Sequence, residues 1–345
     1  MKVTMGEVAK RAGVSKALVS RYLNGKPGVS QANKIKIKNA IDDLHYRLPG
    51  AKEVSSISII VDGVSDFHVP LLTACSAVAL AEGSVLSIIN CFNDIDIKIK
   101  AAKIISQGSA QGVIVYGSTI TDKAMIDIFI QNKIPLVLVE NDLPNTDVEK
   151  ILVDNYQGQY NITKYIIDTG FKDIRMIPYD LSTRAGSERM AGFLAALREN
   201  NLMAGNNYIY PLQKPGFQGV FEIINNLKIH NSVPEVLICG DDTVAAHVLI
   251  SCDKLGITVP GDLSITGFDG IPIDLLAPWA YVLTTMRQPL AEMGDFATKR
   301  LLKHIKNPYE APQKTVFNST LVRGETVKTG GPNGKNNGAP LYNGD

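Results

Sequence analysis

The chain has 345 residues, of which 45% are hydrophobic and 20% charged, and its formal net charge is +1. This composition is ordinary for a globular protein, and the length suits a small domain with one large or two medium ones. No run of about eighteen uncharged apolar residues occurs, and the N-terminus lacks the apolar run of a secretory signal, so we expect a cytoplasmic protein without a membrane span.

Residues 1–47 predict three short helices around a small core. Thr4 and Glu7 have the spacing of a capping box and precede the apolar positions of a first helix. Gly13 interrupts that pattern, and Ser15 can cap a second helix. A third helical pattern follows and supplies the missing apolar face. This is the plan of a helix-turn-helix DNA-binding domain.

Charge favours a DNA-binding role for these helices. Residues 1–50 contain ten Lys and Arg against three acidic residues, a net charge of +7, so residues 51–345 carry +1 − 7 = −6. A basic module on an acidic body is typical of phosphate-backbone binding. The alternative interpretation is a helical hairpin with a solvated, charged face.

The second helix offers candidates for reading bases and for binding phosphates. Its early, solvent-facing residues would enter the major groove, where Arg can bind guanine with two hydrogen bonds and Ala can contact a thymine methyl. These residues are Lys16, Ala17, Ser20 and Arg21. Short hydroxyl and amide side chains and a lysine are better placed for phosphates, and they are Thr4, Ser15, Asn24 and Lys26.

One stretch of this domain resembles the lac repressor/galactose repressor family of bacterial transcription regulators. It reads EVAKRAGVSKALVSRYLNG and is followed by VS and then LHYR. The match is highly specific, although Leu18 stands where the family usually has Thr. The resemblance implies that Lys16, Ala17 and Arg21 occupy base-reading positions.

Residues 48–56, LPGAKEVSS, have the Pro, Gly and Ser content of a linker. Family members usually carry a longer segment with a hinge helix that inserts a leucine into the minor groove, and this linker is about six residues shorter. We therefore expect weaker hinge ordering and less DNA bending. Nine extended residues still span roughly 30 Å, so the domain can reach DNA.

The rest of the chain alternates short apolar strands with helices. Strands are expected at 57–61, 85–91, 113–116, 135–139, 151–153, 174–178, 208–210, 236–239 and 263–267. Helices are expected at 71–82, 97–107, 158–169, 187–200, 219–227 and 243–255. Continuous apolar strands separated by helices indicate parallel sheets with both faces covered. We therefore predict an α/β core over residues 57–329, with two doubly wound parallel-sheet lobes and a cleft between them.

The family resemblance extends over this core, which is similar to a periplasmic sugar-binding protein. It implies an N-lobe of about residues 57–156 plus 286–315 and a C-lobe of about 157–285 plus 316–329. The tail, residues 330–345, is rich in Gly, Asn and Pro and is expected to be disordered. It shows no leucine-heptad helix of the kind that joins dimers into tetramers, so a homodimer is expected.

Candidate effector-binding residues follow the strands, because a ligand of an open α/β sheet lies at the carboxyl ends of its strands. Carboxylates and an arginine suit sugar hydroxyls, and aromatic rings cover the apolar face of a sugar. The candidates are Asp62, Phe67, His68, Asp154, Arg189, Asp241, Asp242 and Asp269.

The family resemblance assigns roles to some of these residues. It places Arg189 on the effector-binding arginine and Asp269 on the ligand-contacting aspartate. Asp154 falls on another acid of the cleft. The aromatic residue that often stacks on the ligand falls near Phe217, or Lys214 takes its place if the alignment slips.

Structural alternatives stay open for several candidates. An Asp after a strand commonly caps the next helix, which applies to Asp154, Asp241 and Asp242. Phe67 and Trp279 could form a ligand platform or could simply be packed. The doublet Asp241-Asp242 suggests a metal site, but no third ligand is suitably spaced to complete it.

The sequence indicates no metal, cofactor or catalytic site. The cysteines are widely spaced in apolar surroundings, and we expect buried free thiols at Cys75, Cys91, Cys239 and Cys252. The five histidines lack metal-ligand spacing. A Gly-rich phosphate loop, Gly-x-Ser-x-Gly and a paired acid and base are all missing, so we do not expect an enzyme.

We therefore predict a homodimeric transcription regulator, a repressor, that binds near-palindromic operator DNA. The resemblance implies that a small molecule, a sugar, binds between the lobes and changes their relative angle, which lowers operator affinity. One alternative is a corepressor-dependent regulator that responds to a nucleobase or a partner protein. The other is a cytosolic sugar-binding or sugar-processing protein with impaired DNA binding.

Overall fold

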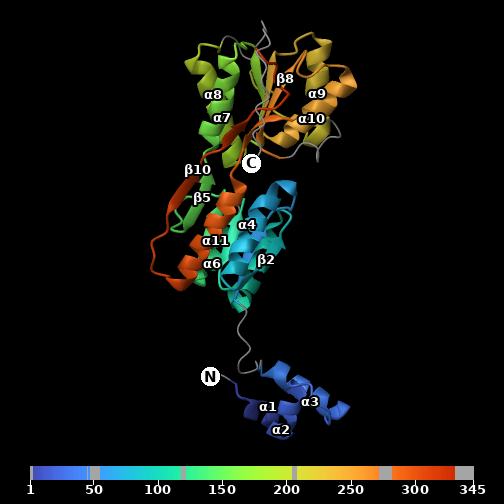
Figure 1. Cartoon of the computed structure of the whole chain (residues 1–345), viewed down its shortest axis with the longest axis vertical. Coiled ribbons are helices and arrows are strands. Elements are labelled where there is room, and N and C mark those ends of the chain that lie inside the picture. Colours follow the sequence, from blue (N-terminus) through green and yellow to red (C-terminus); the bar gives the residue numbers. More distant parts are fainter. Residues whose placement is uncertain are drawn as a thin grey trace. The chain divides into compact units, whose positions relative to one another are not determined.

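The computed structural model describes residues 3–44, 46, 55–117, 122–203, 208–271 and 282–330. The chain divides into two compact units, Met1–Val54 and Ser55–Asp345, which are described separately below (Figure 1). Most of the predicted linker, residues 48–54, and of the predicted tail, residues 331–345, lies outside the described residues. The linker is shorter than predicted at its far end, because the first core strand begins at Ser55 rather than after Ser56.

The N-terminal unit contains the three predicted helices. They are α1 (Met5–Ala12), α2 (Lys16–Leu23) and α3 (Gln31–Asp43). The capping box is confirmed, since Glu7 N donates to Thr4 Oγ1 and Thr4 N donates to Glu7 Oε2 at 2.6 Å. Gly13 ends α1 with a φ of +66°, a left-handed conformation that a glycine adopts without steric cost. The Ser15 hydroxyl then caps α2 by accepting from Leu18 N.

One fully buried residue from each helix forms the centre of this small unit. Val8, Val19 and Ile37 are all inaccessible to solvent. Arg11 of α1 also pairs with Asp43 of α3 at 2.7 Å, but both side chains are exposed. Exposed ion pairs contribute little to stability. Apolar packing around Val8, Val19 and Ile37 is therefore the main interaction that holds the three helices together and orients α2.

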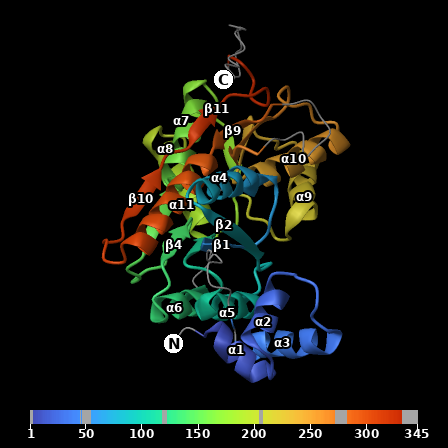
Figure 2. The same cartoon turned by 60° about the horizontal axis from the view of Figure 1, so that its bottom comes forward.

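The N-lobe of the core unit is built on a six-stranded parallel sheet in the order β10-β5-β4-β3-β1-β2. Its strands are β1 (Ser55–Val61), β2 (Ser84–Asn90), β3 (Val113–Tyr116), β4 (Leu136–Val139), β5 (Glu149–Val153) and β10 (Lys314–Phe317). One face packs on α4 (Val69–Ala81) and α11 (Leu290–Lys306), which lie side by side (Figure 2). The other face packs on α5 (Ile95–Ile104), its π-helical extension Ile105–Ser109, and α6 (Lys123–Gln131).

The C-lobe is built on a five-stranded sheet in the order β11-β9-β8-β7-β6. Its strands are β6 (Ile174–Ile177), β7 (Val236–Cys239), β8 (Ser264–Asp269), β9 (Thr284–Arg287) and β11 (Thr320–Val322), and β11 alone pairs antiparallel. One face is covered by α7 (Asn155–Asp168) and α8 (Arg184–Glu199), and the other by α9 (Gly216–Ile229) and α10 (Asp242–Leu255), as Figure 1 shows. The predicted fold class, two doubly wound lobes, is confirmed.

Details of the sequence prediction differ from the structure. The predicted strand at 208–210 is wrong, because this segment forms only one isolated bridge, between Met176 and Ile209. The chain crosses between the lobes after β5, after β9 and after β10. The C-lobe therefore extends to Arg287 and the N-lobe to Phe317, two residues beyond the expected boundaries in each case.

All four cysteines are free and buried, as predicted. Burial raises the pKa of Cys75 to about 11 and that of Cys252 to about 12, so both thiols stay protonated and unreactive near neutral pH. Within the described part of the chain, no helix combines the length and the apolar character needed to cross a bilayer.

A buried ion pair holds the start of β5 to α11. Arg300 donates to both carboxylate oxygens of Glu149, at 2.6 and 2.8 Å, and Gln313 N donates to the same group at 2.9 Å. Burial raises the pKa of Glu149, but hydrogen bonds from Arg300 and His304 outweigh burial and hold this pKa below its ordinary value. The carboxylate is thus ionised and depends on its partners.

We expect Arg300→Ala to lower the free energy of unfolding of the core by ~3 kcal/mol, because it leaves Glu149 charged and buried without its main partner. Urea unfolding at pH 7.5 measures this loss. The control is Lys303→Ala, which removes an exposed cation from the neighbouring Glu310 and should cost less than about 1 kcal/mol. Equal losses in the two variants would contradict the assignment.

Candidate functional site

Helix α2 has one polar, exposed face, and its other face packs in the three-helix core. Val19 is fully buried, whereas Lys16, Ala17 and Arg21 are exposed and Ser20 is half-buried. The four residues predicted to enter the major groove therefore share the side of α2 that does not pack on the three-helix core. A short helix with this division can place side chains on base edges while its other face stays packed.

The predicted phosphate-binding residues surround the ends of the first two helices. The hydroxyls of Thr4 and Ser15 accept backbone hydrogen bonds as helix caps. Asn24 donates to the carbonyl of Ser20 at 2.8 Å, and Lys26 is exposed. A capping hydroxyl lies beside the N–H groups of a helix N-terminus, which themselves favour anions, so these positions are compatible with phosphate contacts.

In the core, Arg189 of α8 is the centre of a buried polar cluster. Its Nε donates to Asn155 Oδ1 at 2.8 Å and its NH1 to the Gly240 carbonyl at 2.7 Å. Its NH2 donates to Asp269 Oδ1 at 2.9 Å, and the guanidinium lies 3.8 Å from the centroid of the Phe268 ring. These contacts commit Arg189 to residues at the carboxyl ends of β5, β7 and β8, with 3% of its surface exposed.

Asp269, the last residue of β8, has a strained backbone. Its φ is +123°, a conformation that a residue with a Cβ rarely adopts. Its Oδ1 also accepts from Gln288 Nε2 at 2.6 Å. Burial raises the pKa of Asp269, and the charge of Arg189 opposes this rise. A strained, buried carboxylate held by two side chains is a common feature of ligand sites.

Asp242 holds the turn that follows Asp269. Its carboxylate accepts from Gly270 N and Ile271 N, both at 2.7 Å, and from Thr285 Oγ1 at 2.6 Å. Burial and the charge of Asp269 raise the pKa of Asp242 well above its ordinary value. Asp242 is fully buried, so its role is to position the strained turn rather than to contact a ligand directly.

Asp241 caps α10 and adds a third carboxylate to the same region. Its Oδ1 accepts from Val244 N at 2.6 Å. Burial, followed by the charge of Asp269, raises the pKa of Asp241 to about 6. The cluster thus places three carboxylates close to one guanidinium, which is an electrostatically costly arrangement without a further cation or proton.

Two aromatic residues of the N-lobe reach the same region. The rings of His68 and Tyr116 meet edge to face, with centroids 5.2 Å apart. Burial lowers the pKa of His68 although the charge of Asp269 raises it, so His68 is neutral near pH 7. Burial and the charges of Glu140 and Asp269 raise the pKa of Tyr116, which keeps its hydroxyl protonated. Asp269 therefore acts on side chains of both lobes.

Glu140 makes a second connection between the lobes. It follows β4 with a φ of +56° and accepts hydrogen bonds from Val153 N and from Asn155 Nδ2 at 3.3 Å. Arg184 NH2 of α8 lies 3.5 Å from Glu140 Oε1. Asn155 therefore links Glu140 to Arg189, because its amide donates to the first and its carbonyl oxygen accepts from the second.

The carboxylate of Asp62, which follows β1, is already committed. Lys98 Nζ lies 2.5 Å from Asp62 Oδ2 and 2.8 Å from Asp122 Oδ1, and the Lys98 side chain is almost wholly buried. Asp62 Oδ1 also accepts from Asn93 N at 3.2 Å. Both oxygens of the Asp62 carboxylate therefore have protein partners at the end of the N-lobe sheet, and neither is open to a ligand in this arrangement.

The remaining predicted residues lie elsewhere or have structural contacts. Asp154 caps α7 by accepting from Gln157 N, and Phe67 packs against the N-lobe core. The Phe217 ring contacts Phe221 and His247, and no described contact joins it to the Arg189 cluster. Its alternative Lys214 pairs with Glu222 at 2.6 Å. Trp279 lies outside the described residues.

Sequence reasoning missed several residues around the candidate site, including Tyr179, whose ring centroid lies 5.8 Å from the Arg189 guanidinium, and Lys98, which pairs with Asp62 outside the Arg189 cluster. Gln288, Glu140 and Tyr179 each follow a strand, so the rule that found Asp269 could have found them. Asn155 carried no charge to attract notice, and Lys98 lies within a helical pattern with no local signal of its partners. Their roles depend on contacts between segments that are distant in the sequence.

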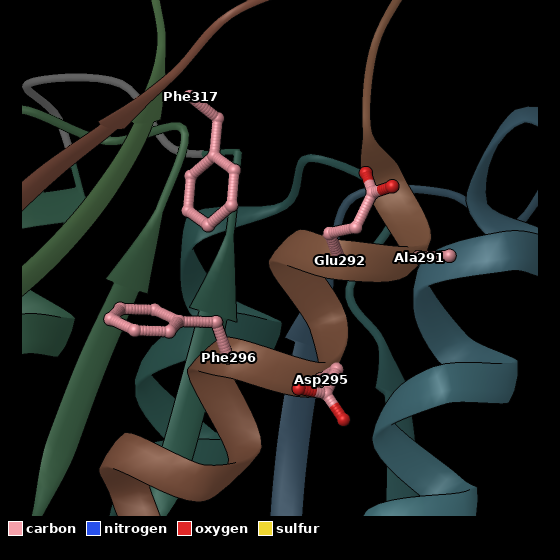
Figure 3. A pocket seen from close by; sticks show the side chains of 5 residues that line it. All are labelled: Ala291, Glu292, Asp295, Phe296 and Phe317. Atoms are coloured by element: carbon pink, nitrogen blue, oxygen red, sulfur yellow. The ribbon is translucent and has the colours of Figure 1, made fainter.

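A separate hollow of about 390 Å³ lies on the N-lobe at the start of α11 (Figure 3). It is lined by Ala291, Glu292, Asp295, Phe296 and Phe317. Figure 3 shows the two rings on one side and the two carboxylates on the other. Asp295 pairs with Lys299 at 2.8 Å. No residue predicted for the effector site lines this hollow.

Comparisons with known proteins agree with this architecture. Residues 4–48 match the bacterial regulatory proteins of the lacI family, and residues 163–327 match the periplasmic binding protein-like domain. The HTH-type transcriptional repressor PurR of Yersinia pestis (strain Pestoides F) is 28% identical over 342 residues, which cover 95% of this chain and 97% of the relative.

Solved structures share the fold at lower identity. A complex of the transcriptional regulator CelR with cellobiose has a TM-score of 0.70 at 21% identity and covers 94% of this chain and 100% of that chain. The lac repressor dimer bound to operator and the anti-inducer ONPF has a TM-score of 0.67 at 19% identity. The match covers 95% of this chain and 99% of that chain. These likenesses confirm the predicted fold class, a helical N-terminal region with a two-lobed α/β core.

We expect Asp241→Asn to raise the stability of the ligand-free core by ~2 kcal/mol at pH 7.5, because Asn keeps the cap of α10 and removes a buried charge. A carboxyl with a raised pKa binds its proton more tightly in the folded state. The contribution of Asp241 to the free energy of unfolding therefore falls as pH rises from about 4 to about 6 and then stays constant. Urea unfolding at pH 4.5 and 7.5 should show the variant's advantage only at the higher pH.

The control for this measurement is Asp154→Asn. Asp154 also caps a helix after a strand but does not belong to the three-carboxylate cluster, so its replacement should change stability little at either pH. An Asp241→Asn variant that is less stable than the wild type at pH 7.5 would refute the electrostatic account.

Proposed function

Because the chain belongs to the lacI family of bacterial regulatory proteins, we propose that it acts in the cytoplasm as a homodimeric transcriptional repressor. The observation that carries this proposal is the exposed face of α2, with Lys16, Ala17 and Arg21, in a unit of net charge +7. The role is one of binding rather than catalysis. Each protomer would bind one half of a near-palindromic operator through α2.

Within this proposal, affinity and specificity come from different residues. The excess of Lys and Arg attracts the phosphate backbone whatever the sequence, and this attraction falls as salt rises. Arg21 and Ala17 supply contacts to base edges, which depend on sequence. Thr4, Ser15, Asn24 and Lys26 would hold the register by contacting phosphates.

The Arg189 cluster is the proposed effector site. It lies at the carboxyl ends of C-lobe strands, and His68 and Tyr116 of the N-lobe reach it. A ligand that binds both lobes favours one of their relative arrangements, and only its differential affinity for the two arrangements can shift the population. A sugar suits the acceptors and rings of this site, and the structural neighbour CelR was solved with cellobiose.

Dimerisation is supported by exposed apolar residues on one side of the N-lobe. They lie on α4, on the edge strand β2, in the loop after β2 and at the start of α5, and they are Leu80, Val85, Ile88, Phe92, Ile95 and Ile97. An exposed edge strand with apolar side chains is rarely left uncovered in a monomer. We propose that a second protomer covers this side, which would bring two DNA-binding units together.

For DNA recognition, we expect Arg21→Ala to cost roughly 1–3 kcal/mol of discrimination at one base pair of each half-site. Operator sequences are first selected from a random DNA pool with the wild type. Gel shifts with the selected operator and its single-base variants then measure discrimination.

Lys36→Ala is the matched control, because Lys36 is an exposed cation on α3 rather than on α2. It should weaken binding to all sequences alike and leave discrimination intact. Uniform weakening by Arg21→Ala would show that Arg21 contacts phosphate only. Failure of the wild type to select any sequence would refute the proposed function.

For the dimer, we expect Ile88→Glu to produce monomers at micromolar concentration, because it places a charge in an apolar interface. Analytical ultracentrifugation gives the mass directly. Ile130→Glu is the control, because Ile130 is similarly exposed on α6 but lies outside the proposed interface. A monomeric wild type, or an Ile88→Glu dimer of unchanged affinity, would contradict the assignment.

A further inference from the structure

The chemistry of the proposed effector follows from the hydrogen-bonding capacity that the Arg189 cluster leaves unused. Arg189 already donates from all three of its nitrogens to Asn155, Gly240 and Asp269. Asp269 accepts on Oδ1, and no described donor reaches its Oδ2. Gln288 is 6% exposed; its Nε2 donates to Asp269, and its Oε1 has no partner among the described residues. One N–H of Arg189 NH1 and one of NH2 also have no described acceptor, so the unused capacity consists of two acceptor oxygens and two guanidinium N–H groups.

The charges of this cluster do not balance. Asp241, Asp242 and Asp269 contribute three negative charges when ionised, and Arg189 contributes one positive charge, so the net charge is −2. His68 is neutral near pH 7 because burial lowers its pKa. Burial raises the pKa of each of the three carboxyl groups, which shows that the surroundings do not fully stabilise their charge.

Neighbouring cations do not supply the missing charge. Arg184 is shared between Glu188, at 2.7 Å, and Glu140. Arg287 pairs in register with Asp269 in the sheet, but its side chain is exposed and no described hydrogen bond or ion pair joins it to the three carboxylates. The adjoining sequences that lie outside the described structure, residues 118–121 and 272–281, contain no Lys, Arg or His.

We propose that the effector is a polyhydroxylated amine, such as an amino sugar, whose ammonium group binds beside Asp269 in the field of Asp241. This inference rests on the proposed function of the cluster as the effector site and specifies the ligand class. An ammonium has only donors, so it matches the open Oδ2 of Asp269 and the Oε1 of Gln288. Hydrogen bonds between charged groups are also shorter and stronger than neutral ones.

The same surroundings disfavour other ligands. A neutral sugar supplies donors for Gln288 and Asp269 but adds no positive charge to a cluster of three carboxyl groups and one guanidinium. A phosphorylated or carboxylated ligand adds negative charge where no described cation is available, and a buried like charge is costly. The ligand's hydroxyls and apolar face would meet the rings of His68, Tyr116 and Tyr179.

Matched ligands test this inference on the full-length protein. The first set is glucosamine, glucose and glucose 6-phosphate, and the second is galactosamine, galactose and galactose 6-phosphate. The third compares tris(hydroxymethyl)aminomethane with pentaerythritol, its neutral analogue. The shift in melting temperature of the core is measured at pH 7.5 in an amine-free buffer of constant ionic strength, and calorimetry gives Kd for any ligand that stabilises.

We expect an amine to bind at least about tenfold more tightly than its neutral parent, and the phosphates to give no shift. The inference is overturned if the neutral parents shift the melting temperature as much as the amines do. It is equally overturned if a phosphate shifts it more, or if no amine gives a shift up to ~50 mM.

Two carboxylate-to-amide variants locate the binding. Asp241→Asn should reduce the advantage of the amine over its parent at least about tenfold. Glu292→Gln should keep that advantage, because Glu292 lines the separate hollow on α11, where two rings and two carboxylates could also attract an amine (Figure 3). Loss of the advantage in Glu292→Gln, with retention in Asp241→Asn, would place the amine in that hollow and overturn the inference.

A DNA readout separates this inference from the proposed function. If the protein selects an operator and a neutral sugar changes its affinity, the regulator function stands and the amine inference falls. If amines bind at the cluster but the protein selects no DNA, the amine inference stands and the regulator function falls. The regulator function and the amine inference both stand only if the amine with the lowest Kd also changes operator affinity.

Discussion

The core depends on one buried guanidinium. Arg189 of α8 donates to Asn155, to the Gly240 carbonyl and to Asp269, and these three acceptors come from the ends of three different strands. An arginine does not lose its proton in a protein, so this positive charge persists at every accessible pH. It permits the nearby carboxylates to remain buried, but it cannot neutralise all three. The excess negative charge is the basis on which we propose a ligand with donors for this region.

Positioning of Asp269 has a second cost, which is backbone strain. Its φ of +123° is maintained because Asp242 holds the next two N–H groups and Gln288 N donates to the Asp269 carbonyl at 3.1 Å. Strain of this kind persists only where surrounding contacts over-determine it. Stability is therefore lower here than the chain could achieve, and the residues responsible are those that form the candidate site.

Much of the fold was predictable because its signals are local. Apolar runs predicted nine strands, of which eight are confirmed; 208–210 is wrong, since Ile209 pairs at a single bridge, and β9, β10 and β11 were not predicted. The rule that ligands lie after strands identified Arg189, Asp241 and Asp269, which the structure brings together. It could not distinguish Asp62, whose carboxylate is paired with Lys98, because Lys98 lies 36 residues away in a helix. The family resemblance, not this rule, assigned Phe217, and its described ring contacts are with Phe221 of α9 and His247 of α10.

The connections between the lobes explain how a ligand at Asp269 could alter the whole core. Asn155 lies just after the first crossing and Gln288 just after the second, and both are hydrogen-bonded within the Arg189 cluster. Asn155 also donates to Glu140 of the N-lobe, so one amide joins Asp269, through Arg189, to β4. A ligand that competes for Asp269 or Gln288 changes the bonding at two of the three points where the chain passes between lobes. Because the lobes can reorient only at such points, the proposed effector site is also placed to control their relative angle.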